Sequence, residues 1–414
     1  MTTRLFLILA AAALSAACGE SPTTVPITAL PRALTAGEQQ LVAANNRFAF
    51  SLFREIAARA HPDSNLFISP VSVGMALGMT VNGAAGSTRD SMLRALELAG
   101  LPLDEVNRGY RGVIDLLRGL DRSVEFTLAN SIWYRTGITV GQPFLDDART
   151  WFDADVRSLD FASPTAARTI NDWVSAQTRG KIPEIVDDPI PADVIMYLIN
   201  AIYFKGSWTQ RFDRALTRDR AFTLRGGGVA TPTMEHSAPA PARYHFGDGV
   251  TLVDLPYGGR AWSMTILLPE AAADIDSLVA GLTQVRWDGW MAALDTGGVI
   301  VTLPKFTLRY EDSLNAVLSA LGMREAFCGP WLTDFTRLLP TGGACISKVR
   351  HKTFVDVYEE GTEAAAVTSV EIRDTSAPPG PPHIVVDRPF VVAIRERLSG
   401  TVLFLGRVMN PKAS

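Results

Sequence analysis

The sequence predicts an α+β fold in one large domain, and three observations support this prediction. Helical and strand-like segments alternate irregularly from about residue 37 to the end of the chain. No internal repeat and no linker-like composition divides that stretch. The overall composition, 47% hydrophobic and 20% charged over 414 residues, is that of a folded globular chain. Residues 37–414 are therefore treated as one folded unit.

Residues 1–17 are a predicted signal peptide. Arg4 lies in a positively charged start, the apolar run Leu5–Leu14 follows, and small residues precede Cys18. The apolar run is too short to span a membrane as a stable helix. Cys18 is similar to the lipid-bearing cysteine of bacterial lipoproteins, although Leu14 lies one residue further from it than is usual. We expect export, with the protein either lipid-anchored at the cell envelope through Cys18 or secreted after ordinary cleavage nearby.

Residues 18–36 predict an extended tether, because they contain three prolines, several threonines and no aromatic residue. Thr35 and Glu38 then fit a capping box, which predicts a helix over 37–60.

The later elements follow from short apolar runs and from helical spacing. The most apolar run, Val194–Phe204, predicts a buried strand. Further strands are expected at Leu128–Tyr134, Phe222–Leu224, Thr251–Leu255, Met264–Leu268, Val299–Leu303, Ile384–Val386, Phe390–Ile394 and Val402–Phe404, and helices at Ile170–Thr178 and Ser313–Leu321. Four prolines between Ser376 and His383 predict an exposed, stiff loop.

Charge and motifs exclude several classes of protein. The net charge of −4, from 39 Lys+Arg against 43 Asp+Glu, argues against a protein that coats nucleic acid. The nucleophile elbow, the zinc-protease helix, the C-x-x-C motif and the P-loop are all missing. The five histidines show no metal-ligand spacing. We expect no enzymatic activity, no cofactor, no metal site and no nucleic-acid partner.

Cys328 and Cys345 are the two cysteines outside the N-terminal segment. Export permits a disulfide between them. Two buried thiols are the alternative.

The segment Glu359–Ser369 is unusual because small residues dominate it directly after the predicted strand Phe354–Tyr358. As a fixed helix such a run would be ordinary. As a strand, alternate small residues from Thr362 to Thr368 would share one face and could enter a packed layer without overpacking it. This pattern is typical of a segment that is a loop in one state and a central strand in another.

Motifs in a fixed order resemble those of the serpin family over about residues 37–411, and Asn200–Trp208 is close to diagnostic. The matching segments are Asn65–Ser72, Ala76–Met79, Gly83–Thr88, Ala129–Trp133, Ile170–Ile182, Asn200–Trp208, Leu303–Phe306, His351–Phe354 and Phe404–Pro411. The resemblance implies a serpin fold with three β-sheets, about eight or nine helices and an exposed reactive-centre loop at about 359–386.

The resemblance also implies a monomeric inhibitor of serine proteases that acts as a suicide substrate. A target protease would cleave the loop and form an acyl-enzyme, and the freed segment would insert into the main sheet, sheet A, before deacylation. The alternatives are a non-inhibitory serpin that acts as a binding module and an inhibitor of cysteine proteases. Non-inhibitory members tend to carry bulky, charged or proline residues in the hinge, whereas small residues dominate here.

The resemblance assigns roles to individual residues. The hinge comprises Glu359, Glu360, Gly361, Thr362, Glu363, Ala364, Ala365, Ala366, Val367 and Thr368. Lys305 resembles the lysine that pairs with Glu359, and we expect a surface ion pair worth about 0–1 kcal/mol. Trp208 resembles the aromatic residue at the same opening of sheet A. The polar cluster under the middle of the sheet is matched by Ser69, Ser72, Asn200 and His351.

The family's spacing places the cleaved bond between Thr375 and Ser376. Threonine at the position read by the primary pocket of the protease predicts an elastase-like or subtilisin-like target. The loop is about three residues longer than is typical. Cleavage between Arg373 and Asp374 is therefore the alternative, and it would predict a trypsin-like target.

Overall fold

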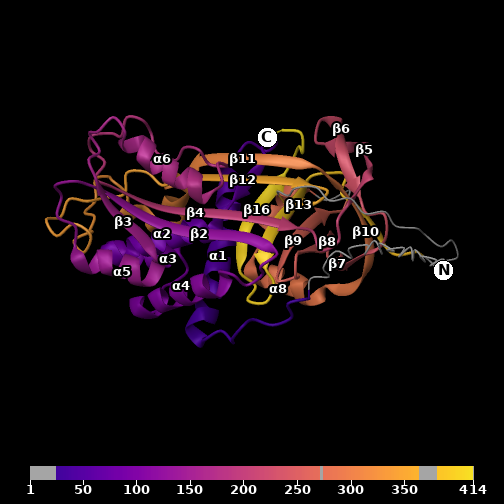
Figure 1. Cartoon of the computed structure of the whole chain (residues 1–414), viewed down its shortest axis with the longest axis horizontal. Helices are drawn as coiled ribbons and strands as arrows, with labels where there is room; N and C mark the ends of the chain where they lie inside the picture. The colour runs from indigo at the N-terminus through magenta and orange to yellow at the C-terminus, as the bar shows by residue number, and fades with distance from the viewer. Residues whose placement is uncertain (1–24, 271–273, 363–379, 414) are drawn as a thin grey trace, which may run out of the picture.

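The computed structural model describes residues 25–270, 274–362 and 380–413. Long strands of one sheet cross the molecule, and α6 (Ala166–Gln177) lies over one end of them (Figure 1). The strands β5 (Asp213–Leu224) to β10 (Asp295–Pro304) gather at the opposite end (Figure 1). In these ranges no helix combines the length and the apolar character that a membrane crossing would require.

The helices predicted at 37–60 and Ile170–Thr178 correspond to observed helices at Ala36–Arg59 and Ala166–Gln177. The α-helices of the described residues are α1 (Ala36–Arg59), α2 (Pro70–Gly83), α3 (Gly86–Ala95), α4 (Leu103–Leu117), α5 (Gln142–Phe152), α6, α7 (Ile275–Ala280), α8 (Gln284–Ala293) and α9 (Asn315–Leu318). The capping box of α1 is confirmed, because Thr35 Oγ1 accepts from the backbone of Glu38 and the Glu38 carboxylate accepts from the backbone of Thr35. Its two hydrogen bonds satisfy backbone N–H groups that a helix start leaves unpaired.

The helix predicted at Ser313–Leu321 is partly wrong. Strand β11 (Phe306–Ser313) takes up its first residue, α9 has only one turn, and an irregular π-type turn follows over Ser319–Met323. Gly322 has a φ of 104°, which no right-handed helix accommodates, and it ends the helical path.

The six-stranded sheet has the order β11-β12-β13-β4-β2-β3. Its strands, besides β11, are β12 (Arg350–Tyr358), β13 (Gly361–Thr362), β4 (Met196–Ser207), β2 (Val124–Arg135) and β3 (Ala154–Leu159). The apolar run Val194–Phe204 forms most of β4, as predicted. This sheet corresponds to the sheet A that the sequence implies.

The ten-stranded sheet contains the other two of the three predicted sheets, which share strand β10. Its strands are β1 (Leu66–Ile68), β16 (Val402–Val408), β15 (Phe390–Glu396), β9 (Trp262–Pro269), β8 (Val250–Tyr257), β7 (Ala240–Gly247), β10, β6 (Gly227–Glu235) and β5, with β14 (His383–Val385) beside β10. The first half of β10 pairs with β7, and its second half pairs with β6 and β14. In the described residues β10 therefore links these two sheets into one continuous set of paired strands.

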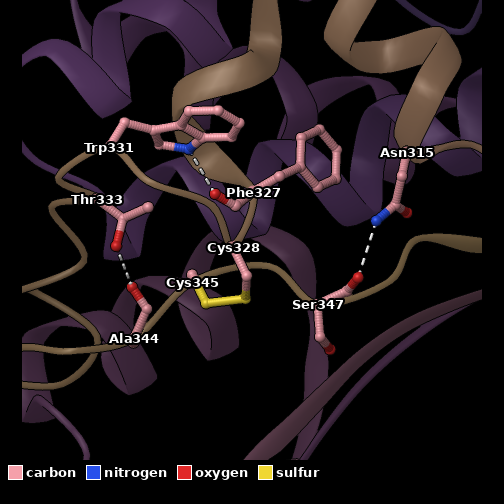
Figure 2. Close-up of a disulfide and its surroundings, with 8 residues drawn as sticks. All are labelled: Asn315, Phe327, Cys328, Trp331, Thr333, Ala344, Cys345 and Ser347. Carbon is pink, nitrogen blue, oxygen red and sulfur yellow. Dashed lines mark hydrogen bonds between the residues drawn. A yellow bond between two sulfur atoms is a disulfide. The ribbon is translucent and has the colours of Figure 1, made fainter.

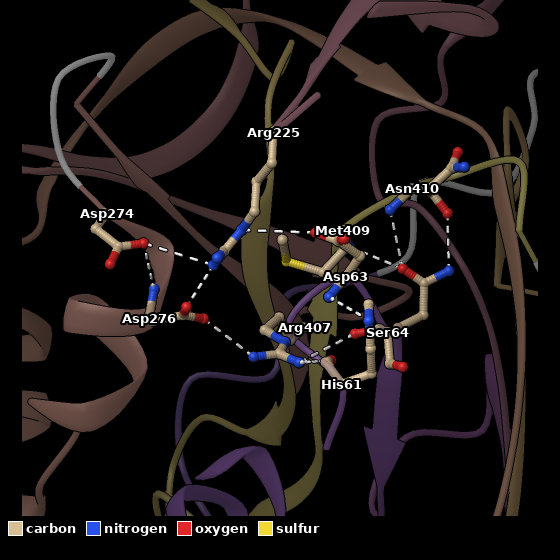
Figure 3. Close-up of polar contacts among 10 residues, drawn as sticks. His61, Asp63, Ser64, Arg225, Asp274, Asp276, Arg407, Met409 and Asn410 are labelled. Atoms are coloured by element: carbon tan, nitrogen blue, oxygen red, sulfur yellow. Dashed lines mark hydrogen bonds and ion pairs between the residues drawn. The ribbon is translucent and has the colours of Figure 1, made fainter. Parts of the chain in front are cut away.

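Motifs from the two ends of the chain meet at the buried guanidinium of Arg407, in the closing motif (Figure 3). Arg407 donates to Asp276 Oδ1 at 3.1 Å and to the carbonyl oxygens of His61 and Ser64. Asn65 accepts from the backbone N–H groups of Met409 and Asn410. The early and closing segments therefore hold each other in place, because each supplies hydrogen-bond partners for polar groups of the other that would otherwise be buried unpaired.

The structure joins Cys328 and Cys345 by a disulfide, with Cα atoms 5.0 Å apart (Figure 2). Hydrogen bonds on both sides of it hold the same loop, from Trp331 Nε1 to the Phe327 carbonyl and from Thr333 Oγ1 to the Ala344 carbonyl (Figure 2). The disulfide cross-links the segment between α9 and β12. β12 is one of the two long strands beside the hinge.

Candidate functional site

The start of the predicted hinge is already a strand. Gly361 and Thr362 form β13, which pairs with β12 on one side and with β4 on the other. Gly361 has a φ of 152°, and a side chain there would collide with the carbonyl oxygen of Gly206 on β4. Glycine is thus required at this point for the chain to enter between two strands.

This placement corrects the expectation that the whole segment from Gly361 lies in solvent before cleavage. Gly361 and Thr362 are both buried, because two ladders of backbone hydrogen bonds already hold them in the sheet. The Thr362 side chain faces inward, and its hydroxyl lies 2.6 Å from the Tyr257 hydroxyl. The other predicted hinge and cleavage positions, Glu363, Ala364–Thr368 and Arg373–Ser376, lie outside the described residues.

Beyond Thr362, a narrow cavity lies between β4 and β12; we call it the strand slot. It is lined by Ile202–Phe204 of β4, by Lys352–Asp356 of β12, by Phe404 and by residues at and just after the end of α6. In the sheet order of the described strands, β12 and β4 are separated by β13, which spans only two residues. The slot therefore continues the line of β13.

The segment just after α6 borders the slot. Thr178, Lys181 and Ile182 contribute to its lining. The Lys181 ammonium lies 4.7 Å from the centre of the Phe354 ring on β12, a cation–π distance. α6 itself packs on the sheet through a separate apolar cluster that includes Trp133, Val174 and Ile199. A strand that entered the slot would have to pass this segment.

We call the surroundings of β13 the entrance region. Trp208 lies there, as the sequence predicts, and its indole N–H donates to the carbonyl oxygen of Tyr358 at 2.9 Å. Its ring stacks on Tyr257 at 4.4 Å, and its backbone N–H donates to the carbonyl oxygen of Glu360. The backbone turn before the hinge is thus held by direct hydrogen bonds.

The predicted pair of Lys305 and Glu359 is present, with the ammonium 3.0 Å from a carboxylate oxygen. It differs from an ordinary surface pair, because Glu359 is buried and also accepts from the Thr217 hydroxyl. Burial opposes ionisation of Glu359, but hydrogen bonds from its own backbone, from Lys305 and from Thr217 together hold its pKa below its usual range. Glu360 forms a second ion pair with Arg214.

The four predicted polar residues lie together under the centre of the sheet; we call them the middle region. The Ser69 N–H donates to His351 Nε2 at 3.0 Å, and the Ser69 hydroxyl donates to the carbonyl oxygen of Leu403. The Ser72 hydroxyl lies 3.4 Å from the carbonyl oxygen of Asn200 on β4. Burial lowers the pKa of His351 to about 4, so its imidazole is a neutral acceptor at pH 7.

Sequence reasoning missed three side chains of these regions. Tyr257 meets Thr362, Asn130 on β2 accepts from the Asn200 side chain at 2.8 Å, and Thr353 on β12 donates to the Phe67 carbonyl. Asn130 and Thr353 lie in motifs that the sequence singles out, but nothing in the sequence assigns them a polar role. Within the ranges that the structure describes, no group of three His, Cys, Asp or Glu residues could hold a metal ion.

Comparison with known proteins decides the family. The model of the family described as "Serpin (serine protease inhibitor)" matches residues 43–411. The chain belongs to the serpin family. This serpin is 34% identical to an uncharacterised serpin-like protein of Thermococcus kodakarensis over 402 residues, covering 95% of this chain and 91% of the relative. It is also 34% identical to the leukocyte elastase inhibitor of Bos taurus, covering 90% of this chain and all of the relative.

A solved structure of human thyroxine-binding globulin is also similar, with 30% identity and a TM-score of 0.80, covering 91% of this chain and all of that one. The family thus includes a relative named as a protease inhibitor and one named as a binding protein. The serpin fold is shown for this chain, and protease inhibition is supported through the family and its inhibitory relatives.

Proposed function

We propose that this serpin inhibits serine proteases as a suicide substrate, by inserting its cleaved loop into the strand slot. The single observation that carries the proposal is β13, because the loop already enters sheet A at Gly361 and Thr362, and a narrow cavity between β4 and β12 continues its line. A target protease attacks a peptide bond of the loop and forms an acyl-enzyme. Cleavage releases the N-terminal part of the loop, which then extends β13.

Insertion is favourable because each added residue gains backbone partners on two strands. β12 and β4 both line the slot, so a strand between them would form backbone hydrogen bonds on both of its sides. The fifteen steps from Gly361 to Ser376 reach about 50 Å at about 3.3 Å per residue. The attached protease is carried over that distance, and its active site is distorted before water can release it.

We further propose cleavage between Thr375 and Ser376 by an elastase-like or subtilisin-like protease. The small side chain of Thr375 suits a small primary pocket, and one relative is named a leukocyte elastase inhibitor. Cleavage after Arg373 by a trypsin-like protease is the alternative. Export through residues 1–17, with a lipid on Cys18 or secretion without one, would place the inhibitor where it meets extracellular proteases.

The test is incubation with elastase-, subtilisin- and trypsin-like proteases, followed by intact-mass analysis. We expect a covalent adduct equal to the protease plus the inhibitor minus its C-terminal fragment, and the N-terminal sequence of that fragment identifies the cleaved bond. Cleavage should also raise the melting temperature markedly. Cleavage without adduct and without a rise in melting temperature would exclude the proposal.

A non-inhibitory binding role is the second candidate, because human thyroxine-binding globulin shares the fold at 30% identity. The same incubation distinguishes the two functions, since a binding module is cleaved without trapping the protease. A panel that includes cysteine proteases tests the remaining alternative for the target class.

A further inference from the structure

The described part of the predicted tether, residues 25–35, is fixed to the folded domain at two points; we call it the N-terminal strap. The Ile27 N–H donates to the carbonyl oxygen of Gly259 at 2.7 Å, and the Ile27 side chain packs against the main core. At the other end, Arg32 donates two hydrogen bonds, of 2.6 and 2.7 Å, to the buried carboxylate of Glu38. Figure 1 draws the strap as the indigo coil that precedes α1. The strap is therefore an ordered part of the molecule.

The attachment point of Ile27 is the turn between β8 and β9, residues 258–261. Gly259 has no side chain, and an added Cβ would lie 3.1 Å from the Ile27 side chain and 3.1 Å from Asp121. Asp121 is buried and accepts from the Gly259 N–H at 2.7 Å. The turn is thus held from two sides, by the strap and by the segment that precedes β2.

The same turn holds the end of β4. The Gly258 N–H donates to the carbonyl oxygen of Ser207 at 2.8 Å, and the Thr209 hydroxyl donates to the Gly258 carbonyl at 2.9 Å. Ser207 is the residue of β4 that lies opposite Gly361 of β13. Tyr257, directly before the turn, meets Thr362. A continuous series of contacts therefore runs from Ile27 through the turn to both residues of β13.

We propose that the N-terminal strap slows loop insertion, with Ile27 as a positioning residue that acts through the β8–β9 turn. Insertion requires β4 to move away from β12, and β4 ends on a turn that the strap holds in place. If the contact between Ile27 and Gly259 is lost, this turn has fewer partners, and the end of β4 separates from β12 more readily. This inference rests on the proposed function, because it concerns the rate of the same insertion.

Three full-length variants test the strap. Ile27→Pro removes the N–H that Gly259 accepts from, Ile27→Ala removes the packing, and Thr28→Ala changes the exposed neighbouring residue. The first measurement is hydrogen exchange of the amides at 206–208 and 361–362, which reports opening of the entrance whether or not a protease is inhibited. The second is the half-life of inhibitory activity during incubation below the melting temperature.

We expect both Ile27 variants to exchange about fivefold faster at both segments and to lose activity about fivefold faster. The cause is one lost hydrogen bond in Ile27→Pro and lost apolar packing in Ile27→Ala. Thr28→Ala should match the wild type. Faster exchange confined to 259–260, or unchanged exchange throughout, would overturn the role of the strap. A wild-type protein that traps no protease would instead overturn the proposed function, while the exchange data would still decide whether the strap holds the entrance.

Discussion

The entrance region and the middle region bound the same slot, but different chemistry holds them. At the entrance, the turn before β13 is held by backbone hydrogen bonds, by the indole of Trp208 and by the pair of Lys305 and Glu359. In the middle, neutral buried groups such as Ser69 and His351 bond to each other and to backbone carbonyls. The entrance is already occupied by β13, whereas none of the described strands lies between β12 and β4 beside the middle region.

Under the proposed mechanism, this difference predicts where the resistance to insertion lies. A charged pair with a partly exposed lysine responds to salt, because exposed charges are screened. A neutral buried network responds instead to protonation and to loss of single hydrogen bonds, each of which leaves a buried group unpaired. We therefore expect the entrance to set how insertion begins and the middle to set whether it is completed.

The largest expected effect comes from Thr362→Arg at the entrance. The side chain of Thr362 is buried against Tyr257, so a guanidinium there would be desolvated without a carboxylate partner in contact. We expect the yield of covalent adduct to fall by about a hundredfold, equivalent to about 3 kcal/mol, with the protein cleaved as a substrate. Thr362→Ser keeps the hydroxyl and serves as the control. An adduct yield equal to the wild type, measured by intact mass, would contradict the insertion path.

The second prediction concerns acid and the middle region. The pKa of His351 is lowered by burial to about 4, from about 6.5 for an exposed histidine. Stability is therefore fully present above pH 6.5 and is lost as the pH falls toward 4, by about 2 kcal/mol at pH 5. Protonation of Nε2 would also break the hydrogen bond from the Ser69 N–H.

Urea unfolding between pH 7.5 and 4.5 measures this loss. His351→Gln keeps an acceptor and should reduce the pH dependence, although His236, also buried with its pKa lowered to about 4, should retain a similar share. His61→Gln, at an exposed position, is the matched control. A pH profile that His351→Gln leaves unchanged would show that the middle region does not respond to acid.

The sequence predicts a residue of this site when a short motif around that residue identifies its role, and it fails when the role depends on a contact between distant segments. Trp208, Lys305 and His351 are recognised because each lies in a motif. The structure places Trp208 and Lys305 in the entrance region and His351 in the middle region. The contact between Tyr257 and Thr362 joins residues 105 positions apart, and it depends on the register of β13 between two strands. No pattern within either segment encodes that register.

Strand pairing and helix bounds likewise depend on contacts between distant segments. Alternation predicts strands, but it cannot show that β10 pairs with one set of neighbours in its first half and another in its second. Apolar spacing predicts a helix at 313–321, but β11 pairing and Gly322 decide its actual bounds. Pairing partners are a tertiary property, and they override local propensity.

The third prediction returns to the entrance and to Lys305→Ala. The ammonium is partly exposed, so the pair is expected to contribute about 1 kcal/mol. Its loss also leaves the buried Glu359 carboxylate with Thr217 and its own backbone as remaining partners. Loss of activity during incubation should be about fivefold faster than for the wild type. Added salt should speed the loss of activity of the wild type until it approaches that of the variant, and it should change the rate of the variant less. Equal salt effects on the two rates would contradict the role of the pair.

The smallest expected effect is at the segment just after α6, between the two regions. Lys181 lies over Phe354 of β12, and a cation–π contact at a partly exposed site is worth about 0.5–1 kcal/mol. An inserted strand must pass between β12 and β4 at this point, so the contact has to be released. Lys181→Met keeps the length and the apolar stem of the side chain, and it should therefore raise the rate of insertion after cleavage about threefold. The fluorescence of a label on the loop measures this rate. Lys181→Arg keeps the cation and should behave as the wild type, so equal acceleration in both variants would assign the effect to side-chain shape and not to charge.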